Sequence, residues 1–561
     1  MTATSATTTG GAVKRLTRFL PCPQDYGGLA ASWRSDLLAG VTVGIVALPL
    51  ALAFGVSSGV GAEAGLITAI VAGMVAALMG GSSVQVSGPT GAMVVVLAPV
   101  VAVHGPGSVA LLSLMAGLLV CIMGFSGVGR AVAFIPWPVV EGFTLGIAAI
   151  IFLQQVPLAT GTSGVPGHNT LIAAIEAASA AQAPTVLLTL ALVVLVAVVM
   201  VLLQKLFRAV PASLVAVLLA TAAAELLQLD VPRIGPLPHS LPAPAMPAVD
   251  IASVGSLAMP AVAIAVLAAI ESLLSARVAA GMAGPDGRPT GPYSPDRELT
   301  GQGLASIAAG LFGGMPATGA IARTAVNVRS GARTRLAAAV HAAVLLGITY
   351  LASGMVSRIP LAALGGVLMV TATRMVSRRT VAAILRSTRA DAAVFVLTAI
   401  ITVAFDLIVA IQIGLAAAAL FALRKFASLS GVQRETIPGP SAEGDEHIAV
   451  LRLDGAMFFG AAERILQEIS QVRDVQVAII RLSQLRMLDA TGAHALVEVI
   501  SALELRGITV LLKGVRPDHL DLVTNVGVIR SLRHHKHLFE HLPDAVEHAR
   551  SHVLRNAAAS A

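Results

Sequence analysis

Apolar segments follow one another along most of the chain, from residue 37 to residue 426, with short polar stretches between them. An apolar helix of about 20 residues is long enough to cross a lipid bilayer. The pattern therefore predicts a helical transmembrane domain over residues 37–426 with fourteen spans, several of them too short to cross alone. The predicted spans lie near residues 37–54, 65–80, 89–103, 109–126, 130–155, 184–203, 212–228, 256–280, 299–312, 319–330, 335–353, 359–376, 393–406 and 408–425.

Basic residues indicate how these spans are oriented. Loops after even-numbered spans carry most of the Lys and Arg residues, for example Arg374, and positively charged loops stay on the cytoplasmic side. We therefore expect a multi-pass protein of the cell inner (plasma) membrane with both termini cytoplasmic. Residues 1–36 would form a cytoplasmic N-terminal segment, and two long polar loops, 156–183 and 229–255, would face outside.

The third and tenth predicted spans are the shortest, and each begins after a motif that contains proline and glycine, residues 86–92 and 313–323. Half-length helices in matching positions of two repeats indicate a substrate site, because broken backbone is tolerated only around a protein-lined cavity. Two facing helix N-termini would bind an anion through free N–H groups and partial positive charge. Thr90 and Thr318 would add hydroxyl donors, and Arg323 a positive charge. The alternative is that both motifs only end loops at the membrane surface.

An acidic residue, Glu271, lies about fifteen residues into the eighth predicted span. A charged side chain at that depth costs about 3 kcal/mol or more, so such residues usually have a function and face the bundle interior. We interpret Glu271 as a proton-binding residue that couples transport to protons. It would also pair with Arg323, and Ser275, one turn further along, would help to coordinate a cation. The alternative is a purely structural ion pair.

After residue 428 the pattern changes to that of a soluble α/β domain. Short apolar runs at 448–453, 477–482 and 508–512 predict strands, and residues 461–471, 491–506 and 516–524 predict helices between and after them. Alternating strands and helices favour a small sheet covered by helices. We place this domain at residues 447–555 and a linker at 427–446.

Composition and charge support this division. Of the 561 residues, 56% are hydrophobic and 12% are charged, whereas soluble domains carry about 25% charged residues. The mean hydropathy is +0.85. The net charge of +7 does not indicate a nucleic-acid partner, because the basic residues gather in short loops between apolar segments.

No Gly-x4-Gly-Lys phosphate-binding loop and no nucleophile–base pair is found in the sequence, so we expect neither ATP-driven transport nor an enzyme. No cofactor and no metal site is expected. His534, His535 and His537 form a short histidine-rich tract, but without further ligands we interpret it as solvated surface.

Three motifs, residues 36–44, 87–90 and 312–327, resemble those of the sulfate permease family of anion transporters. The resemblance covers nearly the whole chain. It implies two inverted repeats of seven helices, a fold like that of uracil permeases, in which a mobile core moves against a gate as an elevator. The anion would lie between the starts of the third and tenth helices, beside the first. The implied substrate-binding residues are Phe54, Ser87, Gly88, Thr90, Gly91, Thr318, Gly319, Ala320 and Ile321.

Departures from the family pattern bear on the substrate. Leu50 occupies the place of a glutamine found in many sulfate-transporting members, which resembles bicarbonate and dicarboxylate members. Glu271 and Ser275 stand where sodium-coupled bicarbonate members have aspartate and threonine, which resembles proton-coupled members. We therefore expect secondary-active, proton-coupled symport of a small inorganic or organic anion: sulfate, bicarbonate or a dicarboxylate. Sodium coupling, an uncoupled anion channel or exchanger and, as a more distant alternative, a nucleobase permease stay open.

The C-terminal domain resembles STAS, the domain shared by sulfate transporters and anti-sigma-factor antagonists, through residues 488–493. In soluble relatives the equivalent hydroxyl is phosphorylated, which makes Thr491 a candidate regulatory residue. The simpler interpretation is that Thr491 caps a helix N-terminus. We expect this domain to mediate homodimerisation or to bind a regulatory cytoplasmic partner.

Overall fold

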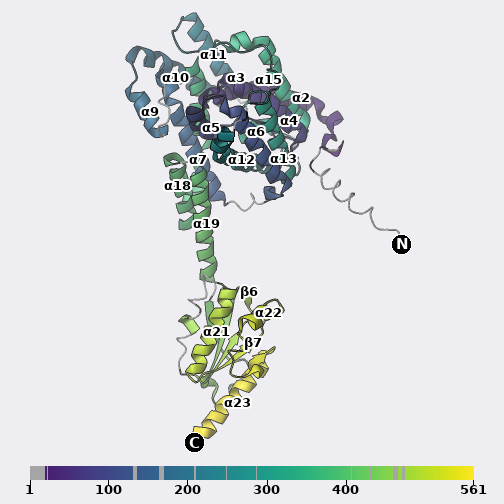
Figure 1. Ribbon diagram of the computed structural model, residues 1–561, viewed down its shortest axis with the longest axis vertical. Helices are drawn as coiled ribbons and strands as arrows, with labels where there is room; N and C mark the ends of the chain where they lie inside the picture. Colours follow the sequence, from purple (N-terminus) through teal and green to yellow (C-terminus); the bar gives the residue numbers. More distant parts are fainter. Residues whose placement is uncertain are drawn as a thin grey trace, which may run out of the picture. The chain divides into compact units, whose positions relative to one another are not determined.

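The computed structural model describes residues 19–560, apart from residues 20, 22, 131–135, 163–169, 208–209, 248, 250, 286, 406, 430, 459–464, 466 and 470–473. The chain divides into two compact units, Met1–Leu415 and Ala416–Ala561. The first unit is helical and the second contains a β-sheet with helices (Figure 1).

Each predicted span overlaps a helix of the structure. The first seven correspond to α2 (Leu29–Ser57), α3 (Ala62–Ile67) continued through η2 (Thr68–Ala72) and α4 (Gly73–Met79), α5 (Gly91–His104), α6 (Ser108–Phe125), α7 (Trp137–Gln154), α10 (Ala183–Leu206) and α11 (Ala212–Leu226). The second seven correspond to α12 (Ile251–Ala280), α13 (Pro295–Leu311), α14 (Ile321–Arg329), α15 (Arg335–Val356), α16 (Leu361–Met375), α18 (Arg389–Ala404) and α19 (Leu407–Leu429). Within the described residues, seven helices are individually long and apolar enough to cross a membrane.

The boundaries differ from the prediction at several places. The fifth helix begins at Trp137 and not at residue 130, and residues 131–135 lie outside the described part of the chain. The loop predicted at 156–183 contains α8 (Val156–Thr160) and α9 (Thr170–Ser179), and α17 (Arg378–Leu385) precedes α18. These helices were missed because they are too short to cross a bilayer.

Helix α2 begins at Leu29, within the segment predicted to precede the membrane domain. Its first two turns mix apolar and polar residues, and a tertiary contact supports their helical conformation. Asp36 is fully buried and accepts hydrogen bonds from the backbone N–H groups of Arg333 (2.6 Å) and Thr334 (3.0 Å). Tertiary hydrogen bonding therefore extends the helix beyond its apolar run.

Small residues let the helices of the first unit approach closely. Gly117 on α6 faces Gly303 on α13, and a Cβ atom at Gly303 would lie 2.6 Å from the Gly117 carbonyl oxygen. Close contact of this kind, with small residues at the interface, is typical of helix packing in membranes. It fixes α13 beside α6.

The buried polar face of α13 holds the chain that leads from α4 into the third span. Glu298 accepts hydrogen bonds from the backbone N–H groups of Gly81 (2.8 Å) and Ser82 (3.0 Å). The Gln302 side-chain amide donates to Glu298 (2.9 Å) and to the Ser87 hydroxyl. These bonds place residue 87 against α13, inside the unit.

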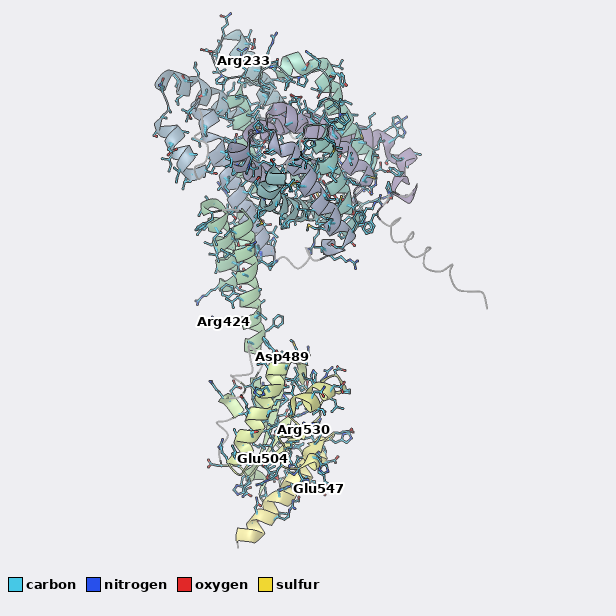
Figure 2. The ribbon with its side chains drawn as sticks, viewed as in Figure 1. Arg233, Arg424, Asp489, Glu504, Arg530 and Glu547 are labelled. Atoms are coloured by element: carbon cyan, nitrogen blue, oxygen red, sulfur yellow. The ribbon has the colours of Figure 1, made fainter. Side chains whose placement is uncertain are left out.

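The second unit is an α/β domain. Its strands are β3 (Gly431–Glu435), β4 (Ile448–Met457), β5 (Val477–Arg481), β6 (Leu485–Leu488), β7 (Thr509–Lys513) and β8 (Leu538–Phe539), and its helices include α21 (Ala490–Leu505), α22 (Pro517–Val526) and α23 (Leu542–Ser560). The strand order is β3-β4-β5-β7-β8, with β3 antiparallel to β4 and the others parallel, while β6 pairs with β4. Figure 2 shows Asp489 where α21 begins and Glu504 near its end.

Alternating strand residues fill two cores. Leu451 and Leu453 of β4 pack with Leu496 of α21, whereas Val450 of β4 packs with Val546 of α23. Helices therefore cover both faces of the sheet, as alternation predicts for a strand buried on two sides. The three predicted strands correspond to β4, β5 and β7. The predicted helix at 461–471 falls largely outside the described residues.

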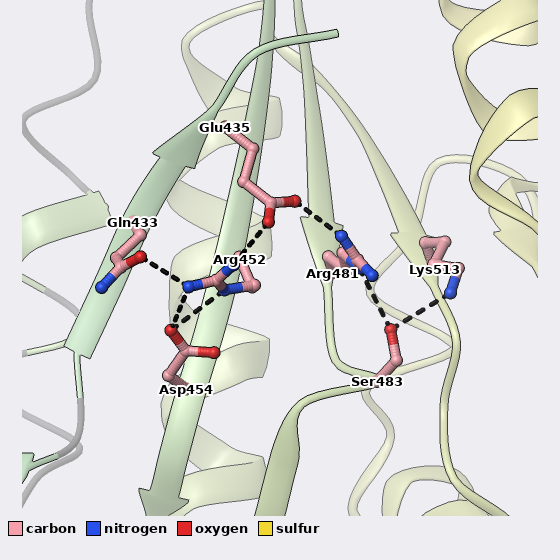
Figure 3. Close-up of polar contacts among 7 residues, drawn as sticks. All are labelled: Gln433, Glu435, Arg452, Asp454, Arg481, Ser483 and Lys513. Carbon is pink, nitrogen blue, oxygen red and sulfur yellow. Dashed lines mark hydrogen bonds and ion pairs between the residues drawn. The ribbon is translucent and has the colours of Figure 1, made fainter. Parts of the chain in front are cut away.

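A charged cluster ties the edge strand β3 to the sheet (Figure 3). One carboxylate oxygen of Glu435 bonds to Arg452 of β4 (2.7 Å), and the other bonds to Arg481 of β5 (2.8 Å). Strand β3 thus belongs to the second unit, although its residues fall within the predicted linker at 427–446. Helix α23, which covers the face of the sheet opposite α21, was not predicted.

Candidate functional site

Two short strands bring the interrupted spans together. Strand β1 (Ser87–Gly88) pairs antiparallel with β2 (Thr318–Gly319), with Ser87 opposite Gly319 and Gly88 opposite Thr318. The Ala320 N–H extends this pairing by donating to the Val86 carbonyl oxygen (2.9 Å). Segments more than 200 residues apart in sequence are therefore side by side.

Helices α5 and α14 begin immediately after the paired strands, at Gly91 and Ile321. The N-cap residues are Thr90 and Ala320, and neither side chain accepts a hydrogen bond from a backbone N–H group in the first turn of its helix. The first turn of a helix carries N–H groups without an intrahelical partner and a partial positive charge. The structure thus places two uncapped N-termini beside one another, as the two motifs predict.

Phe54 of α2 lies beside the start of α5. Its side chain is 7% exposed, and its ring atom Cε1 lies 3.4 Å from the place that a Cβ atom of Gly91 would occupy. A Cβ atom at residue 91 would make only ordinary contact with this ring, but it would lie 2.2 Å from Cδ1 of Ile151, so glycine at this position makes room for Ile151. The predicted substrate-binding residues gather around this point, although Ile321 is 39% exposed.

Glu271 of α12 reaches both interrupted motifs. Its atom Oε2 accepts hydrogen bonds from the hydroxyl groups of Thr90 (2.8 Å) and Thr318 (2.9 Å), which lie 3.2 Å from each other. One carboxyl group thus occupies the hydroxyl donors of the third and the tenth spans at once. Sequence analysis selected these three residues separately, and the structure brings them into contact.

Arg323 is buried beside Glu271 but does not form the predicted ion pair. No contact within ion-pair distance joins the two side chains, both of which the structure describes. Arg323 instead donates from Nη2 to the Pro89 carbonyl oxygen, and its Nη1 has no hydrogen-bond partner within the described part of the chain. The two side chains thus make no direct ion pair, although they are close enough for their charges to interact.

Ser275, one turn along α12 from Glu271, contacts the other interrupted helix. Its buried hydroxyl lies 3.3 Å from the hydroxyl of Thr324 on α14, which also accepts a hydrogen bond from the Val86 N–H (3.0 Å). Ser275 therefore helps to hold α14 against α12 and β1. Its role in coordinating a cation stays a prediction.

Sequence reasoning missed the polar residues that support the site. The Ser272 hydroxyl accepts a hydrogen bond from the Gly319 N–H (3.1 Å), and the Gln85 amide donates to the Ser272 carbonyl oxygen (3.3 Å). Gln302 fixes Ser87, as described above. A signal was present, because Glu298 and Gln302 recur at a four-residue interval and so share one face of a helix.

Thr491 is exposed in the first turn of α21 and does not cap it. The N-cap residue is Asp489, whose carboxylate accepts a hydrogen bond from the Gly492 N–H (2.7 Å). The capping interpretation of Thr491 is therefore wrong. Its phosphorylation stays a prediction.

Together, the interrupted helices and their uncapped N-termini define a multi-pass helical membrane transporter for anions. A sequence model of the sulfate permease family matches residues 33–398, and one of the STAS domain matches residues 439–545. The chain belongs to the sulfate permease family. It is a transporter and not an enzyme.

Similar proteins and solved structures support the assignment. The chain is 31% identical over 523 residues to the putative sulfate transporter YvdB of Bacillus subtilis, covering 91% of this chain and 96% of that protein. It is 30% identical over 502 residues to the bicarbonate transporter BicA of a Picosynechococcus species, covering 83% and 86%. The solved structure of SLC26A9 matches with a TM-score of 0.81 over 97% of this chain and 95% of that chain, at 16% identity, and so shows the fold alone.

The transmembrane domain of a cyanobacterial BicA also matches, with a TM-score of 0.60 and 28% identity over 69% of this chain and 97% of that chain. These matches confirm the predicted fold class, a multi-pass helical membrane protein with a C-terminal STAS domain. The number of spans and their arrangement as inverted repeats stay predictions.

Proposed function

We propose that the chain is a proton-coupled symporter of a small oxyanion, of the sulfate or bicarbonate class, and that Glu271 binds the coupled proton. The observation that carries this proposal is the shared position of Glu271. Its carboxylate accepts hydrogen bonds from the hydroxyl groups of Thr90 and Thr318. These two residues stand at the two helix N-termini that would bind the anion. The protonation state of Glu271 would therefore affect the same hydroxyl donors that bind the anion.

The coupling has a simple electrostatic basis. An ionised Glu271 competes with the anion for the donors and repels it. Two like charges about 5 Å apart at an effective dielectric constant of about 20 repel by roughly 3 kcal/mol. Protonation removes that repulsion, so each ligand favours binding of the other, as linkage requires.

Arg323 supports this assignment. Its guanidinium bonds directly to the Pro89 carbonyl oxygen and not to the Glu271 carboxylate. A direct structural ion pair was the main alternative to a coupling role. A buried guanidinium beside the helix N-termini adds positive potential that favours an anion.

We infer the substrate class from the similar proteins and from the kind of hydrogen-bond donors at the site. The similar proteins named above are described as sulfate and bicarbonate transporters. Backbone N–H groups and two hydroxyl groups match the oxygen atoms of such anions. We further propose that the protein resides in the plasma membrane with both termini cytoplasmic, as the basic loops favour, and that it functions as a homodimer.

The test is uptake into liposomes that contain the purified full chain. Labelled sulfate, bicarbonate and fumarate are each supplied with and without an inward proton gradient. We expect one of the inorganic anions to accumulate only with the gradient. In Glu271→Gln, which imitates the protonated carboxyl group, anion exchange should continue but the gradient should no longer drive accumulation.

Glu63→Gln is the matched control, because Glu63 is an exposed carboxylate on α3 that contacts neither interrupted motif. It should behave as the wild type. Gradient-driven uptake that persists in Glu271→Gln would refute the coupling role. Fast flux that follows the membrane potential and does not depend on pH would show an uncoupled channel. Accumulation of fumarate alone would show that the substrate is a dicarboxylate and not an inorganic oxyanion.

A further inference from the structure

Three histidines converge in the second unit, far along the chain from the transport motifs. His537 ends the short helix η5 (His535–His537), and His548 and His552 are one turn apart on α23. The His537 ring centre lies 5.5 Å from those of both other rings. One ligand nitrogen from each of the three residues lies within 4.8 Å of the other two.

His537 is not the solvated residue that its sequence context predicts. Its side chain is 4% exposed, and its Nδ1 has no hydrogen-bond partner among the residues that the structure describes. A buried polar atom without a partner is rare and indicates a bound ion, a water or a functional role. The ring is also hydrogen-bonded to the backbone of Val510, which fixes its position.

The fold determines this arrangement. Pairing of Leu538 with Leu512 places β8, and thus the residue before it, at the edge of the sheet. Val546 and Val553 of α23 pack on the same sheet. His548 and His552 lie between them in the helix and therefore face β8. Figure 2 labels Glu547, the neighbour of His548, on this helix. The three side chains are therefore brought together by packing of secondary structure.

We propose that His537, His548 and His552 form a binding site for a divalent transition-metal ion of the zinc type. Zinc takes imidazole ligands at about 2.0–2.1 Å in a tetrahedral arrangement, which requires two nitrogens to stand about 3.3 Å apart. The Nε2 atoms of His548 and His552 are 3.3 Å apart. Three protein ligands leave a fourth position for water or an exogenous ligand.

Metal binding requires neutral imidazoles, because a protonated ring has no free lone pair. Burial and the neighbouring rings of His552, His548 and His534 lower the pKa of His537 to about 4. Burial also lowers the pKa values of His548 and His552, with Arg555 contributing to both. A metal ion bound by these three rings would join α23 to the end of the sheet.

The experiment uses the full chain, purified without a polyhistidine tag and stripped of metal with a chelator. Zinc affinity is measured by competition with a chromophoric chelator, and cobalt(II) absorption reports the coordination geometry. We expect one zinc ion per chain and a tetrahedral cobalt spectrum. His548→Gln should weaken zinc binding at least about 100-fold, because it removes a direct ligand.

His494→Gln is the matched control. His494 lies on α21, is exposed and pairs only with Glu498, so its removal should leave zinc affinity unchanged. His552→Gln provides a second ligand variant, and circular dichroism shows that each variant is folded. Absence of stoichiometric zinc in the wild type, or equal affinity in wild type and His548→Gln, would overturn the proposal. Neither outcome depends on the transport assay.

Discussion

At the residue scale, the site requires that position 88 carry no side chain. Gly88 has a φ angle of +154°, which an L-residue rarely adopts. A Cβ atom there would lie 2.7 Å from Nη1 of Arg323 and 3.4 Å from the Ala69 Cα atom. The guanidinium of Arg323 can therefore stand against β1 only because residue 88 is glycine.

We predict that Gly88→Ala abolishes anion uptake in the liposome assay, because it displaces Arg323 or separates β1 from β2. Gly105→Ala is the control for backbone strain. Gly105 also has a positive φ angle, +77°, but a Cβ atom there would meet nothing within 4 Å. If both variants lose uptake equally, strain at positive φ explains the loss and the close approach of Arg323 does not.

Individual contacts were the part of the site that the sequence predicted least well. Glu271, Thr90 and Thr318 were each selected from intramembrane polarity and from the proline–glycine motifs, and they do meet. Arg323 makes no direct contact with Glu271, because sequence position alone does not fix the direction of a long side chain. A nearer partner, the Pro89 carbonyl oxygen, takes the guanidinium.

At the element scale, the interrupted helices can be predicted from the sequence, whereas an element that is held mainly by its neighbours cannot. Proline and glycine before short apolar runs predicted the starts of α5 and α14 to within two residues. Strand β3, in contrast, has little apolar character and is held by the two-sided ion pairs of Glu435. Such an edge strand exists because of its neighbours, so its own pattern does not reveal it.

The start of α21 gives a prediction at this scale. Loss of an N-cap side chain costs about 1 kcal/mol, which is about a fivefold increase in local opening. Asp489→Ala should therefore speed hydrogen exchange in the first turn of α21 in the full chain by about that factor. Thr491→Ala is the matched control and should change little, because its side chain is exposed. Faster exchange in Thr491→Ala than in Asp489→Ala would return the capping role to Thr491.

At the scale of the whole molecule, the chain combines two units that bury their side chains in different ways. The first unit joins its helices through small residues and a few buried polar bonds, whereas the second has an alternating α/β core. The composition change near residue 428 predicts two domains, and the structure divides the chain between Leu415 and Ala416. The convergence of His537 with His548 and His552 was not predictable, because it depends on how α23 packs on the sheet.

Linkage between proton and anion gives the last prediction, on the stability of the whole transporter. A ligand that binds only the folded state raises its stability by an amount that grows with ligand affinity. If a protonated Glu271 favours the anion, the same sulfate concentration should raise the melting temperature of the purified chain more at pH 6 than at pH 8. Sulfate is the suitable probe because its charge is constant over this range, unlike that of bicarbonate. In Glu271→Gln the shift should be equal at both pH values, since the titrating group is gone. A sulfate-induced shift that depends on pH equally in wild type and variant would place the coupled proton on another residue, while leaving the anion site at the two helix N-termini intact.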